Sequence, residues 1–512
     1  MMEKYEGLFT KYQDSRSLTK LKTYALWTVP SAFPETEADT DSIGNTPIEH
    51  DYQSIGAVLV NFLAAKLAGL LFPVTQSFFK IKPTEVLKGI AKNVFAVDDD
   101  TVKNELIQLE NDAAAALFKN ASYAQLIQMM RYLIITGNCL FKRINGKMTV
   151  YSLRNYAQLR DNEGTVLDVI LKENWAWSSL PPVTRSIIGL PQDTPDDKNI
   201  PVFTRIQRKL IKGHVNYEVS QQSGGVSLGP SSLYPENLCP YNIVVWNMVN
   251  GDSNGRGLVE DHAGDFAKLS DLSRALAVYE INACRVVNLV KPGSTVDIDY
   301  LNDSAGVGEF VQGDPANIQA LESGDAAKIQ QISASLDAIF QRLALAFMYQ
   351  GNTRDAERVT AEELQMNARE TEAALGGVYS QLSQTIHIPL SYQLCQEVNP
   401  AFITAVIAGE VELEVITGLP ALGRSTVVTQ LLQAVQEIGV IIQTVAAVSQ
   451  RFDKEKIIDL ILQARGINLE DVMLSKEALK AQEEQLQAEQ AAQAGMGMGG
   501  QPAPTEDITS IL

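Results

Sequence analysis

Cysteine and histidine are scarce in this sequence, and their scarcity excludes several classes of site. Among the 512 residues there are four of each. The cysteines lie far apart and form no CxxC pair, so neither a disulfide framework nor a zinc ribbon is expected, and a reducing compartment fits best. The sequence contains no HExxH motif. We therefore expect a protein that is not an enzyme and that holds no metal and no cofactor.

Positive charge is also in deficit. The chain has 42 Lys and Arg against 61 Asp and Glu, a formal net charge of −19. A free-standing nucleic-acid binder gains its affinity mainly from Lys and Arg that neutralise phosphates, so this balance argues against one. It does not argue against a conduit, because a channel through which DNA slides needs a wall that does not adhere to phosphate.

Long apolar runs are missing as well. The most apolar stretch, residues 55–74, contains Asn61 and Lys66 and is short for a membrane span. The N-terminus lacks the apolar core of a signal peptide. We expect a soluble, unexported protein in which residues 52–72 form a helix of the core. A helix on a membrane surface is the alternative.

Two long helical patterns stand out between residues 325 and 391. In residues 326–348, apolar side chains recur at steps of three and four, which is typical of one face of an α-helix. The second pattern runs from 359 to about 386, and Pro389 is expected to close that helix. The polar residues between them, 349–358, predict an exposed loop. On periodicity alone, an ordinary helical hairpin is an equal alternative.

A sheet is predicted in the first half of the chain. Turn signals at residues 145–146, 161–164 and 212–213 each separate two runs of strand-forming residues. They predict three antiparallel hairpins and, with the helices before them, an α+β domain that ends near Gly255. The basic run at 205–212 fits a solvated strand face better than a nucleic-acid edge.

Two patterns resemble sites but fit structural roles better. The acidic triplet at 98–100 stands directly before a helical run, where carboxylates cap the helix and meet its positive end. Residues 411–425 imitate a P-loop, with a strand and a GxxxxG spacing. Arg424 stands where that motif needs Lys, so we expect a loop between helices rather than a nucleotide site.

Particular residues resemble the portal proteins, or head-to-tail connectors, of short-tailed, podovirus-type bacteriophages. The segments ERVTAEEL at 357–364 and LGGVYSQLSQ at 375–384 carry the resemblance first. Residues 241–280, with a strand, a glycine turn and a long helix, carry it further. The opening of the chain, with a Pro-rich piece at 27–40 and the Ala-rich helix at 52–72, is similar too. The resemblance covers nearly the whole chain in the same order.

The resemblance implies an α+β, predominantly helical portal fold with wing, stem, clip and crown, which assembles as a ring. The implied parts are a wing at 1–255, a first stem helix at 256–284, a clip at 285–325, a second stem helix at 326–348, a tunnel loop at 349–358, a long wing helix and return at 359–400, a helical crown at 401–490 and a flexible C-terminal tail at 491–512.

The resemblance also implies a function and partners. The expected protein forms a DNA channel, dodecameric in the family, at one capsid vertex. It packages the genome with the terminase large subunit and later ejects it. Other expected partners are double-stranded DNA, the major capsid protein, the scaffolding protein and tail adaptor proteins. The expected location is the virion, and the host cytoplasm during assembly. The alternative is a soluble helical capsid-assembly scaffold without a channel.

In the resembling family the loop before the second helix lines the tunnel, so DNA-facing residues are expected here. They are Gln350, Asn352, Thr353, Arg354 and Arg358. Repeated around a ring, Arg354 and Arg358 would form rings of positive charge that touch phosphate without reading sequence. An alternative for Arg358 is a place at the start of the next helix, paired with Glu362 four residues on.

Overall fold

A computed structural model describes part of the chain. The described residues are 4–33, 48–73, 77–87, 89, 99–119, 122–191, 194–249, 251–283, 286–290, 318–322, 326–349, 377–402, 404 and 411–415. The chain divides into two units, Met1–Ala421 and Leu422–Leu512, and every described residue belongs to the first. The predicted tunnel-loop residues, the P-loop imitation beyond its strand and the C-terminal tail lie outside the described residues.

The chain begins with helices α1 (Tyr5–Tyr12) and α2 (Ser15–Trp27), a 3-10 turn η1 (Pro30–Ala32), and α3 (Ile55–Leu71). The prediction of an apolar core helix is confirmed by α3, whose fully buried side chains include Leu59, Leu63 and Leu67. Val58 of the same helix is exposed. Because α3 is apolar almost all round, periodicity could not decide which side is buried.

The next helices are α5 (Asp99–Leu117) and α6 (Ser122–Thr136). The predicted helix start is confirmed, since Asp99 and Asp100 form the first residues of α5. In α6, one side is fully buried, with Leu126, Met129 and Leu133 among its core residues. Helices α3 and α6 pack against each other in the centre of the main core.

The three predicted hairpins are confirmed, and they form two sheets. The first sheet has the order β10–β2–β3, from β2 (Asn138–Ile144), β3 (Lys147–Tyr151) and β10 (Tyr241–Val245). The second has the order β4–β5–β6–β7–β8, with β9 also paired to β7. Its strands are β4 (Tyr156–Arg160), β5 (Val166–Ala176), β6 (Asn199–Ile211), β7 (His214–Ser223), β8 (Val226–Ser227) and β9 (Ser232–Pro235). Short helical turns η2 (Trp177–Ser179), α7 (Pro182–Ile188) and η3 (Glu236–Leu238) connect them.

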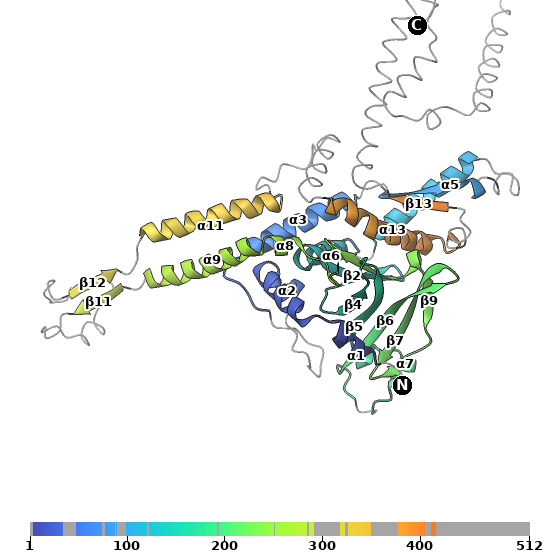
Figure 1. The fold of residues 1–512 in the computed structure, drawn as a ribbon, viewed down its shortest axis with the longest axis horizontal. Coiled ribbons are helices and arrows are strands. Elements are labelled where there is room, and N and C mark those ends of the chain that lie inside the picture. The colour runs from blue at the N-terminus through green and yellow to red at the C-terminus, as the bar shows by residue number, and fades with distance from the viewer. Residues whose placement is uncertain are drawn as a thin grey trace, which may run out of the picture. The chain divides into compact units, whose positions relative to one another are not determined.

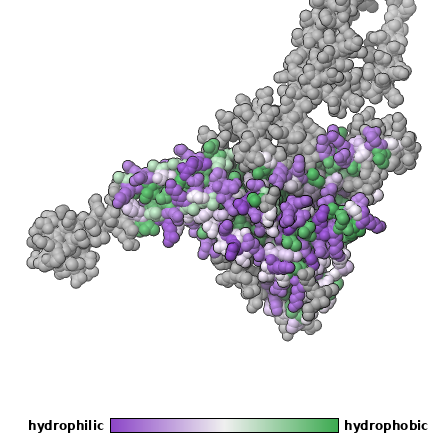
Figure 2. Space-filling view, viewed as in Figure 1, coloured by the Kyte–Doolittle hydropathy of each residue, from purple (hydrophilic) through white to green (hydrophobic). Residues whose placement is uncertain are grey.

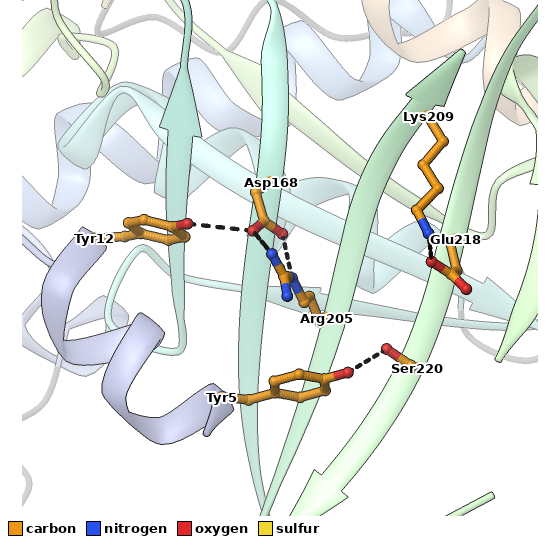
Figure 3. A network of polar contacts seen from close by, with 7 residues as sticks. All are labelled: Tyr5, Tyr12, Asp168, Arg205, Lys209, Glu218 and Ser220. Carbon is orange, nitrogen blue, oxygen red and sulfur yellow. Dashed lines mark hydrogen bonds and ion pairs between the residues drawn. The ribbon is translucent and has the colours of Figure 1, made fainter. Parts of the chain in front are cut away.

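Helix α1 covers one face of the larger sheet, and this corrects the prediction of a solvated face for Arg205 (Figure 3). The guanidinium donates to Asp168 of β5, with 2.6 Å between Nη2 and Oδ2. Tyr12 also donates to that carboxylate at 3.3 Å, and the Tyr5 hydroxyl lies 2.7 Å from Ser220 Oγ. The sequence pattern identified the strand, but a helix almost 200 residues earlier covers it.

Further along the same strand the prediction of a solvated face holds. Lys209 is exposed and forms an ion pair with Glu218 of the neighbouring strand (Figure 3). In the covered part of β6, Phe203 packs edge-on against Phe9 of α1, with ring centroids 5.9 Å apart. The covered and uncovered halves of β6 therefore differ because α1 is only two turns long.

Two helices lie side by side away from the sheets (Figure 1). They are α9 (Ala263–Ala283), preceded by the single turn α8 (Leu258–Asp261), and α11 (Ala326–Ala346). Strands β11 (Val286–Val290) and β12 (Ile318–Glu322) follow the first and precede the second, and they pair with each other. Both predicted stem helices are thus present as helices, and the interval predicted as the clip contains short strands.

A last sheet joins distant parts of the chain. Strand β1 (Phe79–Pro83) pairs antiparallel with β13 (Val411–Val415), and helix α13 (Val378–Val398) packs beside them. Strand β13 had been expected only as part of the P-loop imitation. Its partner was not anticipated, because nothing in a short apolar run specifies a strand more than 300 residues away.

The prediction that Pro389 closes a helix is wrong, since α13 continues through it to Val398. A proline inside a helix costs roughly 3 kcal/mol. Beyond it, Leu390 and Leu394 are fully buried. Each contributes roughly 1.5–3 kcal/mol by leaving water, so burial offsets the proline. The first part of that predicted helix, residues 359–376, lies outside the described residues.

The surface of the described part is mainly hydrophilic (Figure 2). Hydrophobic patches interrupt it over the region of α9 and α11, at the left of that view. The exposed apolar side chains there are Val278, Ile281 and Leu345. Among the described residues, no helix combines the length and the apolar character that crossing a membrane requires.

Candidate nucleic-acid interface

The predicted DNA-facing residues lie outside the described part of the chain. They are Gln350, Asn352, Thr353, Arg354 and Arg358. The structure does describe the two ends of the segment that contains them, Tyr349 and Gly377. How these ends are held decides where that segment leaves the folded body and where it returns.

The segment begins behind a buried aromatic side chain. Phe347, just after α11, is fully buried and meets Phe266 of α9 edge-on, with ring centroids 5.7 Å apart. The ring of His262 lies 6.1 Å away on the same side. This contact, together with the ion pair between Arg342 and Asp265 at 2.6 Å, fixes the end of α11 to the start of α9.

The helix then breaks at one residue. Met348 has a φ of 53°, a left-handed conformation that stops an α-helix. The backbone N–H of Tyr349 donates to the carbonyl of Ala344 at 2.7 Å, which closes the last turn. The Tyr349 ring packs edge-on against Phe62 of α3 at 5.2 Å. The chain therefore turns off the α11 axis at a fixed point of the core.

The other end of the segment is a helix start. Gly377 precedes α13 with a φ of 88°, which glycine adopts without the steric cost that a side chain brings. Its carbonyl accepts the first hydrogen bond of the helix, from the N–H of Gln381 at 3.1 Å.

Helix α13 is anchored by an aromatic cluster. His387 is fully buried between Phe72 and Phe78, with ring centroids 4.8 and 4.9 Å away, and it contacts the backbone of Leu71. Burial lowers the pKa of His387 to about 3, so it is neutral at physiological pH. A neutral imidazole packs here as a core residue and does not serve as a cation for DNA.

The far end of α13 is tied to the first sheet by polar bonds. The Arg143 side chain, 2% exposed, donates from Nη2 to Glu397 Oε2 at 2.6 Å. The amide of Gln393 donates to the Cys239 carbonyl at 2.8 Å. The segment that contains the predicted tunnel loop is thus held at its start by α3 and α9, and at its end by α13, which is bonded to the first sheet.

Gly137, between α6 and β2, lies in close contact with the main chain that leads into α8. A Cβ on Gly137, whose φ is +72°, would lie 2.3 Å from the carbonyl carbon of Arg256. The buried amide of Asn138 exchanges two hydrogen bonds with the backbone of Gly255, each 2.8 Å long. The chain therefore enters α8 in direct main-chain contact with the end of α6.

One polar cavity lies beside this joint. It has a volume of about 320 Å³, and the charged side chains that line it are Asp14, Lys20, Asp252, Arg256 and Glu260. Acidic groups outnumber basic ones there, so it is not suited to phosphate. Within the described ranges, no three His, Cys, Asp or Glu side chains converge as metal ligands would.

The anchoring residues were not predicted as functional. The aromatic residues Phe347 and Tyr349, directly before a polar break, were a usable signal, because aromatic side chains at a helix end fix where the chain leaves the core. His387, Arg143 and Glu397 gave no sequence signal, since their partners lie far away in the chain.

The chain is similar to known sequences over most of its length. A sequence family described as "bacteriophage head to tail connecting protein" matches residues 3–473. The portal protein of Pseudomonas phage phiKMV is 36% identical over 508 residues, which cover 99% of this chain and 98% of that protein. The portal protein of Enterobacteria phage SP6 is 30% identical, covering 82% of this chain and 80% of that one.

Among solved structures, a chain of the neck of an empty gene transfer agent particle is similar over 81% of this chain and 90% of that one. The identity is 12% and the TM-score 0.38. That score is too low to establish a shared fold.

Proposed function

The chain belongs to the family of bacteriophage head to tail connecting proteins, and we propose that it is a portal protein. In this proposal it forms the DNA channel at one capsid vertex, through which the genome is packaged and later ejected. The observation that carries the proposal is the 36% identity to the phiKMV portal protein over almost the full length of both chains.

Ring assembly is part of the proposal. Val278, Ile281 and Leu345 are exposed on α9 and α11, at 49%, 58% and 82% of their surface. Neighbouring subunits in a ring would cover such side chains, and each covered one would add roughly 1.5–3 kcal/mol. The dodecamer is the ring expected from the family.

The parts of the portal are assigned as the sequence predicted. The wing is 1–255, the stem helices are 256–284 and 326–348, and the clip is 285–325. The crown is 401–490. The paired helices α9 and α11, with the paired strands β11 and β12 between them in the chain, support the stem and clip assignments.

The tunnel loop, 349–358, is proposed to face the DNA. The anchoring of Tyr349 on α3 supports this, because it fixes where the loop starts relative to the stem helices. Arg354 and Arg358 would meet phosphates once per subunit. Each contact would be weak and screened by salt, so these rings would retard the duplex rather than hold it.

The proposed partners are double-stranded DNA, the terminase large subunit, the major capsid protein, the scaffolding protein and tail adaptor proteins. The role is structural rather than enzymatic. The proposed location is the capsid vertex of the virion, and the host cytoplasm during assembly. A scaffold without a channel is less well supported, because the similar curated proteins are named as portal proteins.

Negative-stain microscopy with light scattering tests the ring. We expect particles with a central hole and a mass many times the 56.0 kDa of one chain. A stable monomer at micromolar concentration would contradict the proposal. A large assembly without a hole would favour the scaffold.

Charge reversal tests the tunnel loop. We expect Arg354→Glu to leave rings intact and to impair DNA packaging or retention, because a closed acidic ring repels the duplex. Arg16→Glu is the matched control, since Arg16 is exposed on α2 and is not assigned to the channel. Packaging at the wild-type level by Arg354→Glu rings would end the assignment of this loop.

A further inference from the structure

The two strands of the β1–β13 sheet have unlike outer edges. In an antiparallel pair, opposite residues alternate between pairs that exchange two hydrogen bonds and pairs whose backbone groups point outward. The backbone N–H of Ile81 donates to Glu110 Oε1 at 2.6 Å, so Ile81 points away from β13. Leu413, directly opposite, must therefore point away from β1.

The outer edge of β1 is closed. Both backbone groups of Phe79 are bonded by the side chain of Ser77, whose hydroxyl donates to the Phe79 carbonyl at 2.8 Å and accepts from the Phe79 N–H at 3.4 Å. Ile81 is bonded to Glu110, and Pro83 has no N–H to offer. No outward N–H of this strand is free to pair with another chain.

Within the described part of the chain, no strand or side chain pairs with the outer edge of β13. By the same alternation, Val411, Leu413 and Val415 direct their N–H and C=O groups outward. Across the described residues, none of these groups makes a hydrogen bond on that side. An open strand edge is a template for a further strand. A two-stranded sheet also gains stability from a third strand.

The side chains of β13 indicate which strand fits. Glu412 and Glu414 are exposed on one face, where β1 places Lys80 and Lys82 opposite them. Lys82 reaches Glu414 at 2.7 Å. On the other face Val411 is buried against α13. Opposite charges across neighbouring strands are favourable, so a second strand beside β13 should also alternate apolar and basic residues.

We propose that the outer edge of β13 binds an extended segment of a partner protein, which alternates apolar and basic residues and adds to the sheet as its third strand. Backbone hydrogen bonds to Val411, Leu413 and Val415 provide the affinity. The carboxylates of Glu412 and Glu414 favour basic side chains in the partner segment. The inference does not depend on the ring or on the tunnel loop.

The test uses the full chain and a fluorescein-labelled peptide, Thr-Val-Lys-Ile-Lys-Val-Thr, with binding followed by anisotropy. Leu413→Pro removes one outward N–H and no hydrogen bond to β1, because Glu412 and Glu414 make those bonds. Leu413→Ala is the matched control, since it keeps the N–H. We expect binding by wild type and by Leu413→Ala, and binding weakened about tenfold or more in Leu413→Pro.

A second variant covers the case in which Leu413→Pro does not fold. Glu412→Lys should weaken the basic peptide severalfold and strengthen a peptide with Glu in place of both Lys. Equal binding of both peptides by wild type would overturn the proposal, as would unchanged binding by Leu413→Pro. If wild type instead associates with itself through this edge, and Leu413→Pro abolishes that association, the occupant is a second copy and the proposed partner is wrong.

Discussion

Helix α3 and the helix pair α9 and α11 differ in how completely a single chain buries them. Along α3, eight of seventeen residues are buried, and Leu59, Leu63 and Leu67 have no exposed surface. Along the pair, the fully buried side chains gather at the end nearest the sheets, around Phe266 and Leu343. Apolar side chains further along remain in contact with water.

The two regions should therefore differ in whether their stability depends on protein concentration. The core around α3 is buried within one chain, and it includes the ends of α9 and α11 nearest the sheets. Among the described residues, the pair α9 and α11 leaves Val278, Ile281 and Leu345 exposed. If neighbouring subunits cover them, as proposed, the stability of this pair should depend on protein concentration. All four tryptophans, including the buried Trp246, lie in the first 246 residues, so tryptophan fluorescence follows this part of the chain and not α9 or α11.

The largest loss of stability is expected at Gly137, where the chain after α6 touches the chain before α8. Gly137→Ala places a methyl group 2.3 Å from the backbone of Arg256, at a φ of +72°. We expect a loss of about 4 kcal/mol or more, or failure to fold, by urea unfolding. The control is Gly213→Ala, which has a similar φ of +83° and open space around it. It should lose only about 1–2 kcal/mol. Equal losses would show that the contact at the joint is unimportant.

A pair of leucine truncations compares the regions directly. Leu63→Ala should lower the free energy of unfolding of the core around α3 by about 2–5 kcal/mol, because it leaves a cavity among fully buried side chains. Leu345→Ala, at a residue 82% exposed, should change it by less than about 0.5 kcal/mol. The second variant should instead weaken assembly, measured by light scattering. If Leu345→Ala lowered the free energy of unfolding of the core as much as Leu63→Ala does, the proposed difference between the two regions would be wrong.

Removing the carboxylate from one buried and one exposed ion pair should give a smaller difference in the free energy of unfolding. Glu397→Gln removes the charge that faces Arg143, whose side chain is 2% exposed. We expect a cost of about 1–3 kcal/mol, because a buried guanidinium loses its counter-charge. Glu414→Gln breaks an ion pair that is half exposed on both sides and should cost at most about 1 kcal/mol. Urea midpoints, followed by tryptophan fluorescence, measure both losses. If Glu414→Gln lowered the midpoint as much as Glu397→Gln or more, burial of the ion pair would not determine the cost.

The smallest effect is a pH dependence in the helix pair. The hydrogen bond from Arg342 lowers the pKa of Asp265 below its ordinary value. A carboxyl with a depressed pKa stabilises the fold above its unfolded pKa of about 3.9, and this contribution is lost as pH falls through the depressed value. Wild type should thus exceed Asp265→Asn in melting temperature near neutral pH, and the gap should close below about pH 4. A constant gap would contradict this.

Local patterns could be predicted from the sequence, whereas distant pairings could not. The turns at 145–146 and 212–213 were recognisable because Asn145 and Lys212 precede glycines that adopt positive φ. The pairing of β1 with β13 depends on residues more than 300 positions apart, which no local pattern specifies. The helix through Pro389 was missed because tertiary burial outweighed a local rule.

For the candidate site the limit was of another kind. The loop was located from a break in periodicity, and its assignment to DNA came from family resemblance. Its start was not predicted to be anchored by Phe347 and Tyr349. The contacts of these rings with Phe266 and Phe62 become visible only once α9 and α3 are placed beside α11.

The contact at Gly137 has a consequence for how sequences of this fold can change. Main-chain atoms of Gly137 touch those of Arg256 with no side chain between them. Side chains elsewhere in the core can then be exchanged for others of similar volume without changing the direction in which α8 leaves the sheet. That direction is set by the backbone itself, so the geometry between the sheets and α8 tolerates wide variation in sequence as long as Gly137, Gly255 and Gly257 have no Cβ.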